Sequence, residues 1–187
     1  MALGIQRVLT RRVLIYYLTT FLVLAVGEVI GYFMSLRGIQ VLSKSELEEL
    51  ESIAQHPSYM VIFTHNLSLN LIMNIPFIGP IMYVILIGFT GIALGYIVVS
   101  SIGVSVLYLV LAYVSSAILP HGLLELFSYS LSVYNSIDVS VNVIKRRSLN
   151  TTLIYWVLRL LLSVLILFIA AYVEYLELTT LGAVIHA

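Results

Sequence analysis

Two neighbouring stretches, residues 81–99 (IMYVILIGFTGIALGYIVV) and residues 102–119 (IGVSVLYLVLAYVSSAIL), decide the fold. Neither stretch contains a charged residue, and only Ser100 and Ser101 separate them. A helix needs about 20 apolar residues to cross a hydrocarbon core of about 30 Å, and within a helix every backbone hydrogen bond is satisfied without water. The two stretches therefore predict two adjacent transmembrane helices.

The composition of the whole chain agrees with a membrane protein. Of its 187 residues, 61% are hydrophobic and only 10% are charged, which is far less charge than soluble domains carry. Nine basic and nine acidic residues balance to a net charge of zero, so no nucleic-acid partner is expected. The absence of cysteine excludes disulfides, thiolate nucleophiles and sulfur-ligated metals.

Hydropathy extends the prediction to an all-α, polytopic bundle that forms a single integral membrane domain over residues 1–187. The bundle has five or six membrane segments, and at least one is a candidate for a broken or re-entrant helix. The segments are residues 13–33, 59–75, 81–99, 102–119, 121–144 and 151–173. Prolines and glycines predict helix breaks at Pro76, Gly79 and Pro80, and again at Pro120 and Gly122.

The charged connection, residues 37–57, is predicted to form a short amphipathic helix outside the membrane. Its apolar stripe is Leu47, Leu50, Ile53 and Ala54, and its acidic residues are Glu46, Glu48, Glu49 and Glu51. Ser43 and Glu46 have the spacing of a capping box at the start of this helix. The helix either lies at the membrane interface or docks a partner.

Basic residues predict a multi-pass protein of the cell membrane with a cytoplasmic N-terminus, because Lys and Arg beside short loops stay on the cytoplasmic side. Arg7, Arg11 and Arg12 precede the first segment, and a Lys-Arg-Arg cluster fills residues 145–147. Six complete crossings would place that second cluster outside. Either residues 59–74 or residues 123–144 therefore form a re-entrant segment, or the rule is broken here.

Polar residues in two segments are the first candidates for a functional core, since intramembrane polar groups are costly. Asn66, Asn70 and Asn74 recur every four residues, with His65 beside them, and so share one helix face. A second face carries Glu125, Ser128, Ser132, Asn135 and Asn142. These faces either bond to each other between helices or line a path for a substrate or ion.

Glu125 follows the break at Pro120, where the N-terminal end of a helix favours a carboxylate. His121 lies four residues earlier and can share its turn, a spacing that also suits metals. Two ligands do not make a metal site, and the chain contains no His-Glu-x-x-His or Gly-x-Ser-x-Gly motif. We therefore expect no metal, no cofactor and no enzymatic activity.

Glu28 and Arg159 are further intramembrane charges, and Arg159 is expected to pair with Glu28 or with Glu125. Glycines spaced four apart predict close helix packing at Gly27 and Gly31, and at Gly91 and Gly95. We expect this packing within one protomer. A homodimer is expected separately, because two-fold assemblies are the commonest oligomers.

The polar motifs resemble the stage II sporulation protein M (SpoIIM) family. The resemblance rests on Phe63-Thr64-His65-Asn66, on the break between residues 76 and 80, and above all on the heptad Leu-Pro-His-Gly-Leu-Leu-Glu at residues 119–125. It implies a polytopic membrane protein without known catalytic chemistry, with the family-typical positions Asn66, Pro120, His121, Gly122 and Glu125. The chain departs from the family after Glu125, where Phe127, Tyr129 and Tyr134 replace small residues.

The resemblance implies a non-enzymatic scaffold or remodelling subunit of a membrane complex, because sporulation members act with partner proteins in the septal membrane during engulfment. Relatives also occur in organisms that do not sporulate, so the family fixes the fold more firmly than the role. The alternative is a permease-type subunit with a polar path lined by Asn66 and Glu125. Since no phosphate-binding loop is present, this alternative needs an ion gradient or a separate ATPase subunit.

Overall fold

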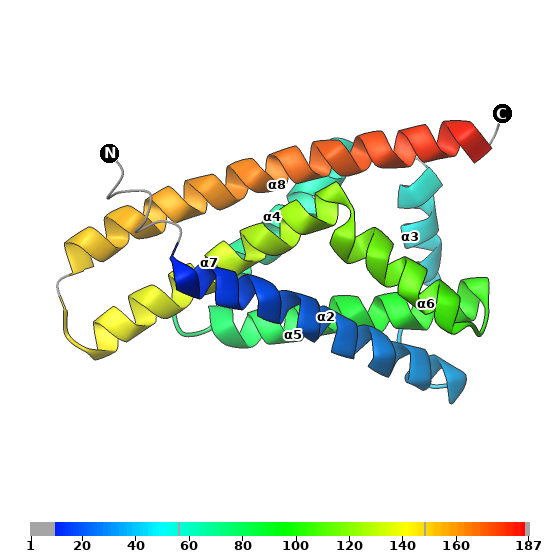
Figure 1. Ribbon diagram of the computed structural model, residues 1–187, viewed down its shortest axis with the longest axis horizontal. Helices are drawn as coiled ribbons and strands as arrows, with labels where there is room; N and C mark the ends of the chain where they lie inside the picture. Colours follow the sequence, from blue (N-terminus) through cyan, green and yellow to red (C-terminus); the bar gives the residue numbers. More distant parts are fainter. Residues whose placement is uncertain (1–9, 56, 148, 186–187) are drawn as a thin grey trace.

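The computed structural model describes residues 10–55, 57–147 and 149–185, and 87% of them are helical, with no strand among them (Figure 1). The α-helices are α2 (Arg11–Leu36), α3 (Lys44–Gln55), α4 (Tyr59–Met73), α5 (Gly79–Ile97), α6 (Val106–Tyr113), α7 (Pro120–Ile144) and α8 (Leu149–Ile185). Two π-helical turns, η1 (Val98–Ile102) and η2 (Val114–Ile118), extend α5 and α6. The prediction of an all-α fold is confirmed.

The described residues contain fewer candidate spans than the five or six predicted. Three helices are long and apolar enough to cross a membrane: Arg11–Leu36, Gly79–Ile102 and Leu149–Thr180. A fourth results if Val106–Ile118 and Pro120–Ile144, which meet at an angle of 63°, form one broken span. Hydropathy counted these two arms separately, because it does not register a bend. The fifteen residues of α4 rise only about 22 Å.

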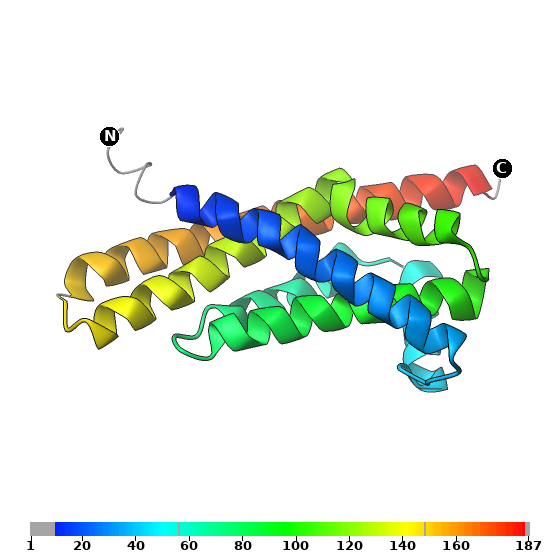
Figure 2. The ribbon, with the colours of Figure 1, turned by 60° about the horizontal axis from the view of Figure 1, so that its bottom comes forward.

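The direction of the helices brings the two basic clusters to the same end of the molecule. α2, α5 and α8 run one way along the long axis, and α7 returns, so the start of α2 and the α7–α8 connection lie at one end (Figures 1 and 2). Arg11 and Arg12 are exposed there, as are residues 145–147. Arg7 lies outside the described residues. Because α6 and α7 form one bent pair, residues 145–147 lie at the same end as Arg11 and Arg12. Their position therefore no longer conflicts with the rule that basic clusters stay on one side of the membrane.

The closest helix pair is α2 with α5, and glycines on each helix make it possible. A Cβ on Gly31 would lie 1.9 Å from the carbonyl oxygen of Ile92, and a Cβ on Gly95 would lie 1.9 Å from that of Glu28. A Cβ on Gly91 would meet the carbonyl oxygen of Leu24 at 2.3 Å. The two glycine motifs therefore pack against each other within one chain.

Apolar side chains cover the outer surface of the bundle. Val104, Val106 and Ile81 are 67%, 68% and 63% exposed, and a soluble protein would not present so many large apolar side chains together. The surface therefore matches a lipid environment.

The helix α3 begins with the predicted capping box. The backbone N–H of Ser43 donates to Oε2 of Glu46 at 2.7 Å, and the N–H of Glu46 donates to Oγ of Ser43 at 3.3 Å. Bonds from Ser43 to the ionised carboxylate lower the pKa of Glu46. The structure describes the side chains of Glu46, Leu47 and Glu48, whereas those of Glu49, Leu50, Glu51, Ile53 and Ala54 lie outside the described part.

Candidate functional site: a polar seam and an acid–histidine cluster

The predicted helix breaks position the polar segments. Pro120 is the first residue of α7, where its missing N–H costs no hydrogen bond. Gly122 lies in the first turn of α7, and a Cβ there would be 2.1 Å from the carbonyl oxygen of Ser116. At the other break, Pro76 lies in the turn after α4, and Gly79 and Pro80 open α5. Each break therefore ends one helix and opens the next.

Buried polar side chains from α4, α7 and α8 form what we call the polar seam. Its members are Asn70, Asn74, Ser128, Ser132 and Ser163, none more than 2% exposed. Oδ1 of Asn70 accepts from Oγ of Ser132 at 2.6 Å and from Oγ of Ser128 at 3.4 Å, and Nδ2 of Asn70 donates to Oγ of Ser163 at 3.1 Å. Asn70 therefore joins all three helices.

Asn74 extends the seam by one turn. Its Nδ2 donates to Oγ of Ser132 at 3.1 Å. Beyond it, Oγ of Ser136 donates to the carbonyl oxygen of Ile75 at 2.6 Å, and the backbone N–H of Phe77 donates to Oγ of Ser140 at 2.7 Å. Phe77 has a φ of 67°, a left-handed conformation that is costly for a bulky residue. The serines of α7 therefore hold the turn between α4 and α5.

A second group, which we call the acid–histidine cluster, lies at the opposite end of the seam. It consists of His121, Glu125, Glu174 and Glu177 together with Asn66. Nδ2 of Asn66 donates to Oε1 of Glu125, and Nδ1 of His121 pairs with Oε2 of Glu177. Glu174 lies one turn before Glu177 on α8, so its carboxyl group faces that of Glu125, and the two groups interact electrostatically. Asn66 and Glu125 are therefore partners, whereas His121 bonds to α8 instead of to Glu125.

Arg159 is buried and has an acidic partner, but the partner is the 23% exposed Asp138 and not Glu125 or Glu28. Nη1 of Arg159 donates to Oδ2 of Asp138 at 2.9 Å and to Oδ1 of Asn135 at 3.2 Å. Its guanidinium also lies 4.5 Å from the ring centre of Tyr134, at the distance of a cation–π contact. Asp138 is the partner because it lies at the level of Arg159 on the antiparallel helix α7, whereas Glu125 lies several turns away.

Glu28 does not join the other charges. It is 2% exposed on the face of α2 that packs against Gly91 and Gly95 of α5. Its Oε1 has no hydrogen-bond partner in the described part of the chain. The structure therefore separates Glu28 from both the seam and the cluster.

Sequence reasoning missed Glu174, Glu177 and Ser163 as site residues. The two glutamates looked like the polar end of the last span, yet α8 continues past them to Ile185. Their spacing of three residues places them on one helix face, as the spacing of four places His121 and Glu125. Two ionisable residues at helical spacing in each segment were therefore the feature of the sequence that could have indicated the cluster.

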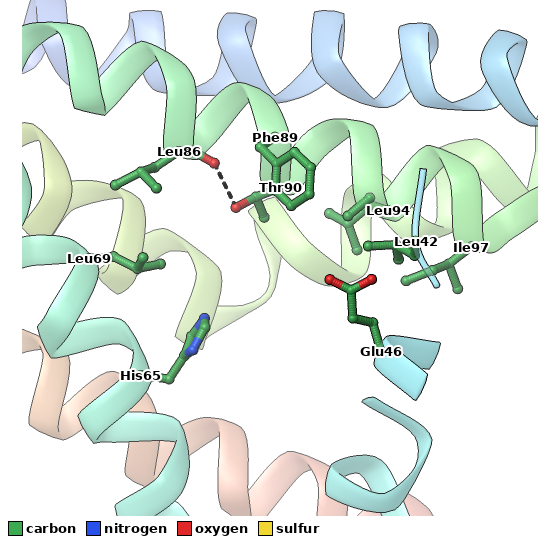
Figure 3. Close-up of a pocket in the computed structure, with 10 residues that line it drawn as sticks. Leu42, Glu46, His65, Leu69, Leu86, Phe89, Thr90, Leu94 and Ile97 are labelled. Carbon is green, nitrogen blue, oxygen red and sulfur yellow. Dashed lines mark hydrogen bonds between the residues drawn. The ribbon is translucent and has the colours of Figure 1, made fainter. Parts of the chain in front are cut away.

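An apolar cavity of about 500 Å³ lies beside the cluster, between α3, α4 and α5 (Figure 3). Leu86, Phe89, Leu94 and other apolar side chains form most of its lining, and His65 and Glu46 project toward it from opposite sides. His65 therefore faces this cavity, while the adjacent Asn66 faces Glu125.

Comparison with known proteins identifies the family of the chain. The family model described as stage II sporulation protein M matches residues 19–175. A search of curated proteins and a search of solved structures each gave no match. The matched region contains the seam, both helix breaks and every member of the cluster except Glu177. Because the match covers most of the sequence, the chain belongs to the stage II sporulation protein M family.

Proposed function

We propose that the chain is a non-enzymatic scaffold or remodelling subunit of a membrane complex. The observation that supports this role best is that each polar side chain of the seam is bonded to another, although Oδ1 of Asn74 has no partner among the described residues. A substrate path needs polar groups that are free to bind a passing ligand. Asn70 instead uses both its amide nitrogen and its amide oxygen on serines of α7 and α8.

The family supports the same role. Sporulation members act with partner proteins in a membrane, so we expect this chain to bind membrane partners as well, and to form a homodimer. Its described mass consists almost wholly of helices that cross or border the membrane. Partners would therefore bind apolar helix faces or the amphipathic helix α3.

We also propose the orientation. With the two basic clusters on the cytoplasmic side of the cell membrane, α2, α5 and α8 cross outward, and the bent α6–α7 pair returns. The short helix α4 must then return as well, which gives five crossings. The acid–histidine cluster and α3 would lie toward the outer side.

The absence of native cysteine allows a direct test of the closed seam. Ser132→Cys and Ser163→Cys place single thiols in the seam with little change in size, and Lys145→Cys places one at an exposed helix end. In proteoliposomes, a charged thiol reagent should label Lys145→Cys and leave both seam variants unlabelled. Labelling of the seam from the aqueous phase would contradict the scaffold.

The alternative remains a permease-type subunit with a path lined by Asn66 and Glu125, working with a separate ATPase subunit or an ion gradient. The 63° bend before α7 and the π-helical turns η1 and η2 favour it, because transporters use broken helices at their binding sites and π-turns occur often at functional sites. A thiol at Asn66→Cys that reacts from the aqueous phase, together with labelled seam cysteines, would favour the permease.

A further inference from the structure

We infer that Glu125 and Glu174 form a proton-binding site, in which the two carboxyl groups share one proton between α7 and α8. The inference goes beyond the scaffold role and does not depend on it.

The contacts of Glu125 require the proton. Its Oε1 accepts from Nδ2 of Asn66, and the carboxyl group of Glu174 faces it from α8, one turn before the Glu177 that pairs with His121. An ionised carboxylate accepts hydrogen bonds but has no hydrogen to donate. Two carboxyl groups that face each other therefore avoid like-charge repulsion only when one of them holds a proton.

The second pair of the cluster connects this proton to the surface. His121 lies one turn before Glu125 and pairs with Glu177, which lies one turn after Glu174. The side chains of His121 and Glu177 are 13% and 22% exposed, so both reach the surface of the bundle. Imidazole and carboxyl groups both take up and release protons. A proton leaving Glu174 can therefore reach water through this pair.

The groups around the two carboxyls come from three helices. Those with an electrostatic effect on Glu125, Glu174 or both are His65 of α4, His121 and Tyr129 of α7, and Glu177 of α8. α2 presents Tyr17, whose hydroxyl donates to the carbonyl oxygen of Leu123 at 3.2 Å. α5 and η2 contain no charged residue. Among the described residues, the groups that act on the pair therefore include two imidazoles as proton acceptors and no Lys or Arg that would hold both carboxylates ionised.

Tyrosines around the cluster place it near the edge of the membrane. The ring centre of Tyr59 lies 6.1 Å from that of Tyr175 and 6.4 Å from that of Tyr172. Tyr59 is 38% exposed and Tyr172 is 50% exposed. Exposed tyrosines are typical of the membrane–water interface, where a proton site can equilibrate with the aqueous phase.

Loss of the proton has a structural consequence. The shared proton attaches α8 to α7, because one carboxyl donates to the other. When it leaves, two negative charges are in contact, and like charges repel strongly where water is scarce. The part of α8 around Glu174 should then separate from α7 as the pH rises.

The test is a pH titration of the carboxyl groups by infrared spectroscopy, with the full chain reconstituted in vesicles. The wild type should show a protonated carboxyl band that persists at neutral pH. Glu125→Gln and Glu174→Gln should each abolish it, because the amide donates to the remaining carboxylate and no shared proton is needed. Glu28→Gln removes a separate buried carboxyl, and Glu48→Gln an exposed one, so both should leave the band of the pair in place.

Two results would overturn the site. One is a band that survives when either Glu125→Gln or Glu174→Gln is combined with Glu28→Gln, and the other is a wild-type band that Glu28→Gln alone removes completely. Titration of wild-type chain carrying ¹³C-labelled glutamate, read by solid-state NMR, needs no substitution and should detect a carboxyl that titrates separately from the exposed glutamates. If replacing K⁺ by Na⁺ in the buffer removed the protonated carboxyl signal, the pair would bind sodium, and the proton site would be overturned.

Discussion

Nη1 of Arg159 donates a hydrogen bond to Oδ2 of Asp138 at 2.9 Å, and this ion pair joins α8 to α7 inside the bundle. The side chain of Arg159 is only 4% exposed. A guanidinium in such a place is stable only while its partner is present, because a lone buried charge keeps its full desolvation cost.

Replacing one member of this pair should therefore destabilise the fold. Asp138→Asn or Arg159→Met is expected to lower the free energy of unfolding by about 3 to 5 kcal/mol, measured by reversible denaturation in mixed micelles. The charge-exchanged double variant, Asp138→Arg with Arg159→Asp, should recover part of the loss. The same exchange between Arg159 and Glu125 should recover nothing, and recovery there would mean that Glu125 is the true partner.

The contact between α2 and α5 gives a second prediction. Gly31→Ala should prevent normal packing, because the new Cβ would lie 1.9 Å from the backbone oxygen of Ile92, which cannot move alone. We expect a loss of about 2 kcal/mol or more in stability, visible in detergent melting curves. Gly88→Ala is the matched control, since its Cβ would meet only Cγ1 of Val23 at 3.9 Å. Equal effects of the two substitutions would contradict the packing.

Serines of α7 allow the polar seam to be tested with one kind of substitution. Ser132→Ala removes the donor to Asn70 and should cost about 1 kcal/mol, within the range of interhelical hydrogen bonds in membranes. Ser130 is equally buried, but its hydroxyl donates at 2.6 Å to the carbonyl oxygen of Phe127 in the same helix. Ser130→Ala should therefore change the unfolding free energy much less, and a reversed order would show that the seam does not stabilise the bundle.

The capping box of α3 should respond to pH. Because bonds from Ser43 lower the pKa of Glu46, the folded helix prefers the ionised carboxylate more than the unfolded chain does. The ionised carboxylate of Glu46 stabilises the helix fully above pH 4.5, the ordinary pKa of the group. This stabilisation is lost as the pH falls through the lower pKa that Glu46 has in the folded helix. The amide proton of Ser43, followed by NMR, should shift over that range. Glu46→Gln should abolish the shift and Glu48→Gln should preserve it.

Local patterns were sufficient to predict several parts of this structure. Apolar runs predict the helices, the spacing of Ser43 and Glu46 predicts the cap, and the glycines at residues 27, 31, 91 and 95 predict close packing. Each depends on neighbours within a few positions along the chain or on a helix face that can be read from periodicity.

Relationships across the bundle could not be predicted in the same way. The sequence does not show that α6 and α7 form a bent pair, so hydropathy counts them as two separate segments. It also cannot show that Asp138, rather than Glu125, lies at the level of Arg159, since that depends on how α7 and α8 are aligned along their length. Glu174 and Glu177 escaped notice for the same reason, because a charge near the end of an apolar run suggests that the span has ended.

The length of α8 has a consequence for what the protein can reach. Its 37 residues rise about 55 Å, whereas the hydrocarbon core is about 30 Å thick. Burying the whole helix would need a tilt of about 57°, outside the range of 0 to 40° seen for membrane helices. Part of α8 must therefore lie outside the lipid tails, in the headgroup region or in the water beyond it.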